Sequence, residues 1–188
     1  MLKHVFAVIA IAAASTAASN ADVKLGEVKS FKDWAIACDN GLSCEATTYF
    51  AENFGNDQIQ LSMSRAAGRE GEITISLYKF STTSDRYQLF IDGRLIDTGS
   101  IASGVREIAP WAEPVDKMIE INGADALKVA RAMVAGKRLI LTDGSGMDIG
   151  KVSLAGSAAS LRYMDAAQGR VGRSNAIAAR GRKQAGGL

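Results

Sequence analysis

Histidine is almost missing from this 188-residue sequence, and its scarcity excludes several classes of site. The one histidine, His4, lies in an N-terminal segment that we expect to be removed. The rest of the chain cannot form a Ser-His-Asp or Cys-His catalytic set, and it cannot bind zinc or copper through imidazole. Catalysis would have to use carboxylates, lysine, tyrosine or serine.

Cysteine is also scarce, because Cys38 and Cys44 are the only two. They flank the turn-forming residues 39–43 (DNGLS), and residues 34–38 and 44–48 on either side alternate with the period of a strand. This pattern predicts an antiparallel hairpin closed by a Cys38–Cys44 disulfide, as expected in an oxidising compartment. A zinc site is disfavoured, since the spacing is not Cys-x-x-Cys and there is no second cysteine pair.

Long apolar runs are missing after the N-terminus. Val5–Ala14 is unbroken apolar sequence, it follows the basic Lys3, and residues 19–21 (SNA) end in a small residue suited to signal peptidase. We therefore expect residues 1–21 to be a signal peptide, and the protein to be periplasmic or secreted. No later run is long enough to predict a transmembrane segment.

The charge is uneven along the chain. Residues 170–188 are rich in glycine, alanine and arginine and contain no acidic residue. We expect a single β-rich domain over residues 22–169, followed by a disordered basic tail over 170–188. By charge alone, four arginines of the tail are candidate contacts to a partner: Arg170, Arg173, Arg180 and Arg182. Export and the lack of interleaved aromatic residues argue against nucleic acid as that partner.

Alternating apolar and polar residues predict strands through most of the domain, and periodic apolar residues predict helices at 124–135 and 157–166. Asn122 stands where it could cap the first of these helices. The expected fold class is α+β: mainly an antiparallel β-sheet or sandwich of about eight or nine strands, with two short helices in the C-terminal half.

Three patterns suggest catalysis or ligand binding, but each has a simpler structural interpretation. Ser76-x-x-Lys79 matches a serine acyl-enzyme motif, although it lies on a predicted strand and lacks the companion motifs. The glycine-rich stretch 143–150 has the spacing of neither a dinucleotide loop nor an EF-hand, which favours a β-turn. Asp92 and Asp97 could form a glycosidase pair, but both fit solvated turn positions better.

One irregular loop offers a rigid aromatic side chain. Trp111 lies between Pro110 and Pro114, and aromatic anchors of this kind dominate many protein interfaces. These three residues are therefore candidate partner contacts. The alternative, in which Trp111 covers one end of the core, is favoured.

Two stretches of sequence carry a resemblance to a known family. Residues 31–46 (FKDWAIACDNGLSCEA) and 151–181 (KVSLAGSAASLRYMDAAQGRVGRSNAIAARG) resemble an exported proteobacterial domain-of-unknown-function family. The chain is more distantly similar to invasion-associated locus B proteins. The resemblance implies a fold and a compartment but no catalytic residues. It also implies a structural role for Arg162 and Asp165, which either pair on the helix surface or hold the tail.

These observations favour an exported, non-enzymatic binding or interaction protein whose partner is an envelope or host protein. No cofactor and no metal are expected. Two alternatives remain open at this point: an inhibitor of a lytic enzyme such as lysozyme, and a carboxylate-dependent hydrolase of envelope glycans.

Overall fold

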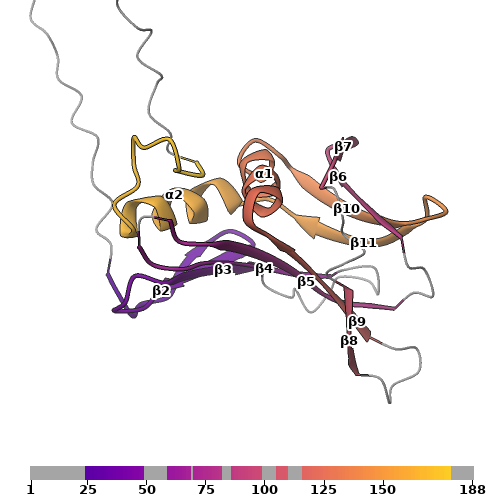
Figure 1. The fold of residues 1–188 in the computed structure, drawn as a ribbon, viewed down its shortest axis with the longest axis horizontal. Coiled ribbons are helices and arrows are strands. Elements are labelled where there is room, and N and C mark those ends of the chain that lie inside the picture. The colour runs from indigo at the N-terminus through magenta and orange to yellow at the C-terminus, as the bar shows by residue number, and fades with distance from the viewer. Residues whose placement is uncertain are drawn as a thin grey trace, which may run out of the picture.

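The computed structural model describes residues 24–48, 59–68, 70–81, 86–98, 105–109 and 116–178. These residues form two β-sheets and two helices (Figure 1). The larger sheet contains β1 (Lys29–Phe31), β2 (Trp34–Cys38), β3 (Cys44–Thr48), β4 (Gln60–Arg65), β5 (Ile73–Ser81), β8 (Val105–Ala109) and β9 (Asp116–Asn122). The smaller sheet contains β6 (Tyr87–Ile91), β7 (Arg94–Ile96), β10 (Arg138–Asp143) and β11 (Asp148–Ser153). The helices are α1 (Gly123–Met133) and α2 (Ser157–Ala167).

All strand pairs in both sheets are antiparallel. The seven strands of the larger sheet follow the order β1-β2-β3-β4-β5-β9-β8, and the four of the smaller sheet follow β11-β10-β6-β7. Both helices and the smaller sheet lie on one side of the larger sheet (Figure 1). The core is therefore built on a single face of the larger sheet.

The strand register arranges side chains in rows across the larger sheet. One row faces the core and is fully buried: Ile36, Ala46, Met63, Ile75 and Ile121. The adjacent row points to the opposite face and carries small or polar side chains: Ala35, Thr47, Ser62, Ser76 and Glu120. Period-two alternation in the sequence thus separates a buried apolar face from a polar one.

Trp34 ties the two sheets together. Its side chain is completely buried, and its indole Nε1 donates a hydrogen bond to the carbonyl oxygen of Ser153 on β11 (3.0 Å). The Ser153 hydroxyl in turn donates to Asp33, which precedes Trp34. An indole ring is apolar except for its N–H group. Trp34 can therefore fill the core and at the same time donate a hydrogen bond to a backbone carbonyl.

The start of α2 approaches the backbone of β1 very closely. Gly156 occupies the N-cap position with φ 104, a conformation that favours glycine. A Cβ atom at this position would lie 1.7 Å from the carbonyl oxygen of Phe31. Only glycine permits this contact between helix and edge strand, and the Phe31 and Tyr163 rings pack beside it with centroids 6.3 Å apart.

The capping role expected for Asn122 is wrong. Asn122 does precede α1, but its side chain makes no capping hydrogen bond. Its Oδ1 instead accepts a hydrogen bond from Thr74 Oγ1 (2.7 Å), because the two residues lie opposite each other on β9 and β5. The strand pairing therefore leaves the first turn of α1 without a side-chain cap.

The expected α+β fold class is confirmed, but the two sheets contain more strands than the eight or nine expected. The additional strands are β1 and β8, at the two edges of the larger sheet. The sequence did not predict these strands, because β1 has only three residues and β8 directly precedes the proline-flanked loop.

Neither helix in the described part of the chain is long and apolar enough to cross a membrane.

We predict that Gly156→Ala destabilises the fold by more than about 3 kcal/mol, because the new methyl group would overlap the β1 backbone and strain the left-handed conformation. Urea unfolding measures the change. Gly146→Ala is the matched control: Gly146 has φ 87 but open space around it, so only the conformational cost of about 1–2 kcal/mol applies. Equal losses for the two variants would contradict the close contact.

Candidate functional site

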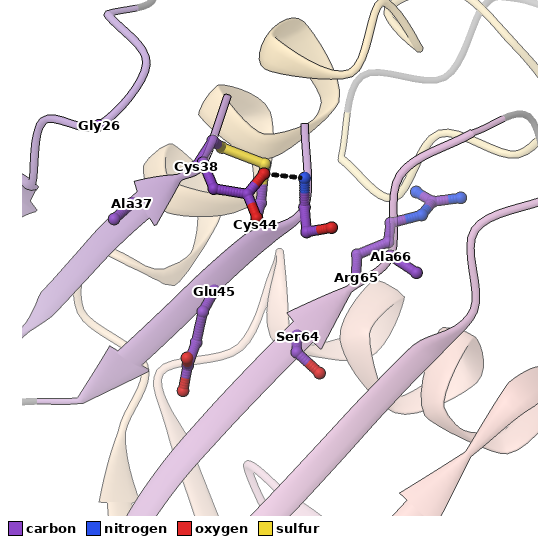
Figure 2. A pocket seen from close by; sticks show the side chains of 10 residues that line it. Gly26, Ala37, Cys38, Cys44, Glu45, Ser64, Arg65 and Ala66 are labelled. Carbon is purple, nitrogen blue, oxygen red and sulfur yellow. Dashed lines mark hydrogen bonds between the residues drawn. A yellow bond between two sulfur atoms is a disulfide. The ribbon is translucent and has the colours of Figure 1, made fainter. Parts of the chain in front are cut away.

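The β2–β3 hairpin ends in a short loop that is fixed by a disulfide. Cys38 and Cys44 lie directly opposite each other and form the expected disulfide bond, with a Cα–Cα distance of 4.0 Å. Within the loop, the Asp39 carboxylate accepts a hydrogen bond from the Ser43 N–H (2.8 Å, Figure 2). The Asp39 N–H donates to the Ser43 carbonyl oxygen (2.9 Å). We call residues 38–44 the hairpin end.

Leu42 has an unusual conformation within the hairpin end. Its φ is 65, although a bulky side chain disfavours the left-handed region, and its side chain is 37% exposed. The Leu42 N–H donates to the Asp39 carbonyl oxygen (3.0 Å), and the Leu42 carbonyl oxygen accepts from Gln168 Nε2 of the segment after α2 (2.8 Å). The fold thus holds an apolar side chain outward in a strained conformation.

An open depression of about 550 Å³ adjoins the hairpin end. Figure 2 shows the residues that line it, which come from the ends of β2, β3 and β4 and include the disulfide. Asp39 and Glu45 contribute carboxylates, and the Glu45 carboxylate also accepts a hydrogen bond from Ser62 Oγ. The side chain of Arg65 extends away from Glu45 (Figure 2). The lining therefore contains two carboxylates, and its one arginine, Arg65, is buried.

A buried charge cluster lies on the core side of β4. We use the term Arg–Asp cluster for Arg65, Asp165 and Arg170, whose residues are 3%, 0% and 2% exposed. Arg65 Nη1 lies 3.6 Å from Asp165 Oδ1. Arg170 donates hydrogen bonds to Gln168 Oε1 (3.0 Å) and to the Gly68 carbonyl oxygen. Two buried guanidinium groups thus share one buried carboxylate.

Asp165 also holds the segment that follows α2. Its carboxylate accepts hydrogen bonds from the N–H groups of Ile177 (3.0 Å) and Ala178 (2.8 Å). Arg65 Nη2 donates to the Asn175 carbonyl oxygen (2.9 Å), and Arg131 of α1 donates to the carbonyl oxygens on both sides of Asn175. We call residues 173–178 the return segment, because they come back to the core after leaving α2.

The return segment packs on the core beyond Gly169. Ala176 and Ile177 are buried, at 0% and 2% exposed, so the chain continues to pack on the core to residue 178. This packing could not be predicted from the sequence, because the segment has no periodic apolar face and is held mainly through backbone atoms. The role implied for Asp165, holding the tail, agrees with these contacts, whereas Arg162 is exposed.

Burial changes the titration of the Arg–Asp cluster. Burial and the nearby charge of Arg170 lower the pKa of the Arg65 guanidinium to about 10, although Asp165 opposes the shift. Burial also lowers the pKa of Arg170, against the favourable charges of Asp165 and Glu70. Both arginines stay protonated at neutral pH, so the cluster carries a net positive charge.

The structure describes two of the candidate partner contacts from the sequence, Arg170 and Arg173. Arg170 is buried in the Arg–Asp cluster and cannot offer its charge to a partner, whereas Arg173 is exposed. The other five lie outside the described residues and stay predictions: Pro110, Trp111, Pro114, Arg180 and Arg182.

The structural interpretations of the catalytic motifs agree with the fold. Ser76 and Lys79 lie on a strand, β5, and not at the start of a helix; the pairing of β5 with β9 shifts register between Tyr78 and Phe80. The Asp92 carboxylate accepts hydrogen bonds from the Lys137 and Arg138 N–H groups, so it fixes a turn. Asp143 organises the β10–β11 turn, and the Ser145 hydroxyl and the Met147 N–H lower its pKa by hydrogen bonding.

Among the described residues, no group of three or more metal-ligating side chains comes together.

We predict that Asp165→Asn lowers the free energy of unfolding by about 3 kcal/mol, because it leaves the buried Arg65 guanidinium without its carboxylate partner and leaves Arg170 with the charge of Glu70 alone. Urea unfolding at neutral pH is the measurement. Asp148→Asn is the matched control, since the Asp148 carboxylate is exposed and lies 3.6 Å from Lys151, and its loss should cost about 0.5 kcal/mol or less. Similar losses for both variants would show that Asp165 does not organise the cluster.

Comparisons with known proteins agree with the resemblance in the sequence. The chain matches the family described as "Protein of unknown function (DUF1176)" over residues 28–187. Its fold is similar to the crystal structure of invasion associated protein B from Bartonella henselae, with a TM-score of 0.55 and 19% identity over 76% of this chain and 99% of that one. Among curated proteins, none matches the chain. The expected resemblance is confirmed, and the chain belongs to the DUF1176 family.

Proposed function

We propose that this protein is an exported, non-enzymatic binding protein that contacts a protein partner through its hairpin end. The observation that carries the proposal is Leu42, an exposed apolar side chain in a left-handed conformation. Such a conformation costs about 1–2 kcal/mol for a residue with a Cβ atom, and strained residues of this kind cluster at functional sites. Glycine adopts the left-handed conformation at little cost, and Gly41 directly precedes Leu42. The loop nevertheless places Leu42 in that conformation.

The surroundings of Leu42 define the chemistry of the partner. An apolar side chain stands beside an acidic depression that contains Asp39 and Glu45. This combination fits a partner with an apolar pocket flanked by lysine or arginine side chains. The contact of Leu42 with Gln168, together with the disulfide, fixes the loop before binding, which reduces the entropy lost on association.

Two further features support export and a role without catalysis. A disulfide on a protein with a signal-like N-terminus fits the periplasm or the exterior, where such bonds persist. Both cysteines are in that disulfide and His4 is the one histidine, so the chain after residue 21 offers neither a free thiol nor an imidazole for catalysis.

Export is testable on the protein produced in a bacterial host. We expect the chain recovered from the periplasm or the medium to begin at Asp22, after removal of residues 1–21, and to have the mass of the oxidised form. Mass spectrometry of the intact protein gives both answers. A chain that stays in the cytoplasm and retains Met1 would contradict the proposed compartment.

Leu42→Gly tests the binding surface, because it removes the side chain and the strain together. We expect this variant to be as stable as the wild type or more stable by about 0.5–1 kcal/mol, yet to lose the partner in crosslinked capture from envelope and medium. Leu95→Gly is the matched control, since Leu95 is an exposed leucine (48%) on β7, far from the hairpin end in sequence. The Leu95→Gly variant should still capture the partner.

The remaining arms of the same experiment separate the alternatives. Glu45→Gln should weaken capture and reduce its sensitivity to salt if the partner is basic. Loss of the partner with Trp111→Ala but not with Leu42→Gly would move the binding site to the proline-flanked loop. Capture that is unchanged by Leu42→Gly would overturn the proposed surface.

A further inference from the structure

The side chain of Gln168 lies between the hairpin end and the Arg–Asp cluster. Its amide makes hydrogen bonds in both directions: Nε2 donates to the Leu42 carbonyl oxygen (2.8 Å), and Oε1 accepts from Arg170 Nε (3.0 Å). The same Nε2 also donates to the carbonyl oxygens of Arg65 (3.1 Å) and Ala66 (3.2 Å) at the end of β4. One amide thus connects the exposed hairpin end to a buried arginine.

Arg170 determines which way this amide points. A guanidinium group only donates hydrogen bonds, so its partner on Gln168 must be the amide oxygen. The amide nitrogen is then directed at main-chain carbonyl oxygens, which only accept. Without Arg170, the Gln168 amide could turn over and place its oxygen against the Leu42 carbonyl oxygen, where two acceptors repel each other. The hydrogen bond to Leu42 therefore depends on the position of Arg170.

The core in turn holds Arg170 in place. Its buried guanidinium group donates to the Gly68 carbonyl oxygen as well as to Gln168, and the charge of Asp165 favours its protonated form. Its main-chain N–H donates to the Asp165 carbonyl oxygen (2.7 Å) as the chain leaves α2. Contacts of both its side chain and its main chain therefore fix the group that orients the amide.

The backbone of Leu42 needs a contact of this kind. Its φ of 65 lies in the left-handed region, which is unfavourable for a residue with a Cβ atom. The net contribution of one hydrogen bond is similar in size to that cost, so the contact with Gln168 can decide whether the conformation persists. The Leu42 N–H is bonded within the hairpin end, to the Asp39 carbonyl oxygen, whereas Gln168 reaches the loop from another part of the fold.

We infer that Arg170 is a positioning residue for the binding surface at the hairpin end, and that it acts on Leu42 through the Gln168 amide. The inference rests on the function proposed above, because it takes Leu42 as the residue that contacts the partner. It gives Arg170 a role at that surface although its side chain is buried and cannot touch the partner.

NMR spectroscopy of the mature, oxidised chain tests the inference without a partner. In the left-handed conformation the N–H and Hα protons of one residue lie close together, so wild-type Leu42 should give a strong NOE between them. Gln168→Glu keeps an acceptor for Arg170 but removes the donor to Leu42, and Arg170→Met removes the group that orients the amide. We expect both variants to shift the amide signals of residues 41–43 and to lose the strong Leu42 NOE.

Two further arginine variants complete the experiment. Arg170→Lys keeps the positive charge but lacks the fork that bonds Gly68 and Gln168 together, so it should also weaken the Leu42 NOE. Arg131→Met is the matched control, since Arg131 donates to two main-chain carbonyl oxygens of the return segment. It should loosen that segment and leave the Leu42 NOE unchanged, because Gln168 keeps its contact with Arg170. A Leu42 NOE of wild-type strength in both Arg170 variants would overturn the inference.

Partner capture separates this inference from the proposed function. Gln168→Glu and Arg170→Lys should weaken capture about threefold to tenfold, as expected for the loss of one hydrogen bond. Loss of the Leu42 NOE with undiminished capture would contradict the binding surface but not the positioning of Leu42. An unchanged NOE in the Arg170 variants would refute the positioning role, whatever the outcome of capture.

Discussion

The carboxylate of Asp165 is the interaction on which the C-terminal half of the structure depends. It is completely buried, it lies beside Arg65 of β4, and it accepts the N–H groups of Ile177 and Ala178. One side chain therefore joins the larger sheet, α2 and the return segment. A buried carboxylate is stable only with such partners, so these three elements must be assembled together.

Two hollows of the surface adjoin the end of β4. One lies at the end of β2, the start of β3 and the end of β4, and the other lies at the β4–β5 turn, the start of α1 and the return segment. Arg65 lines both, but its charged end belongs to the core side.

Sequence reasoning succeeded where the signal was local. The disulfide, the turn between Cys38 and Cys44, and the start of α2 at Gly156-Ser157 follow from spacing and turn chemistry over a few residues. It failed where contacts join distant segments. Nothing near Leu42 in the sequence indicates that Gln168 holds its carbonyl group, and nothing near Arg170 indicates burial. The positive φ of Leu42 also has no sequence signal, because Asn40 and Gly41 are the usual residues for it.

The return segment has a consequence for which substitutions the fold tolerates. Its hydrogen bonds to Arg65, Arg131 and Asp165 are made by main-chain carbonyl and N–H groups, which every residue type except proline supplies. Substitutions outside the buried Ala176 and Ile177 therefore leave these hydrogen bonds in place, provided that the three side chains that hold the segment are retained and that proline does not replace a residue whose N–H donates.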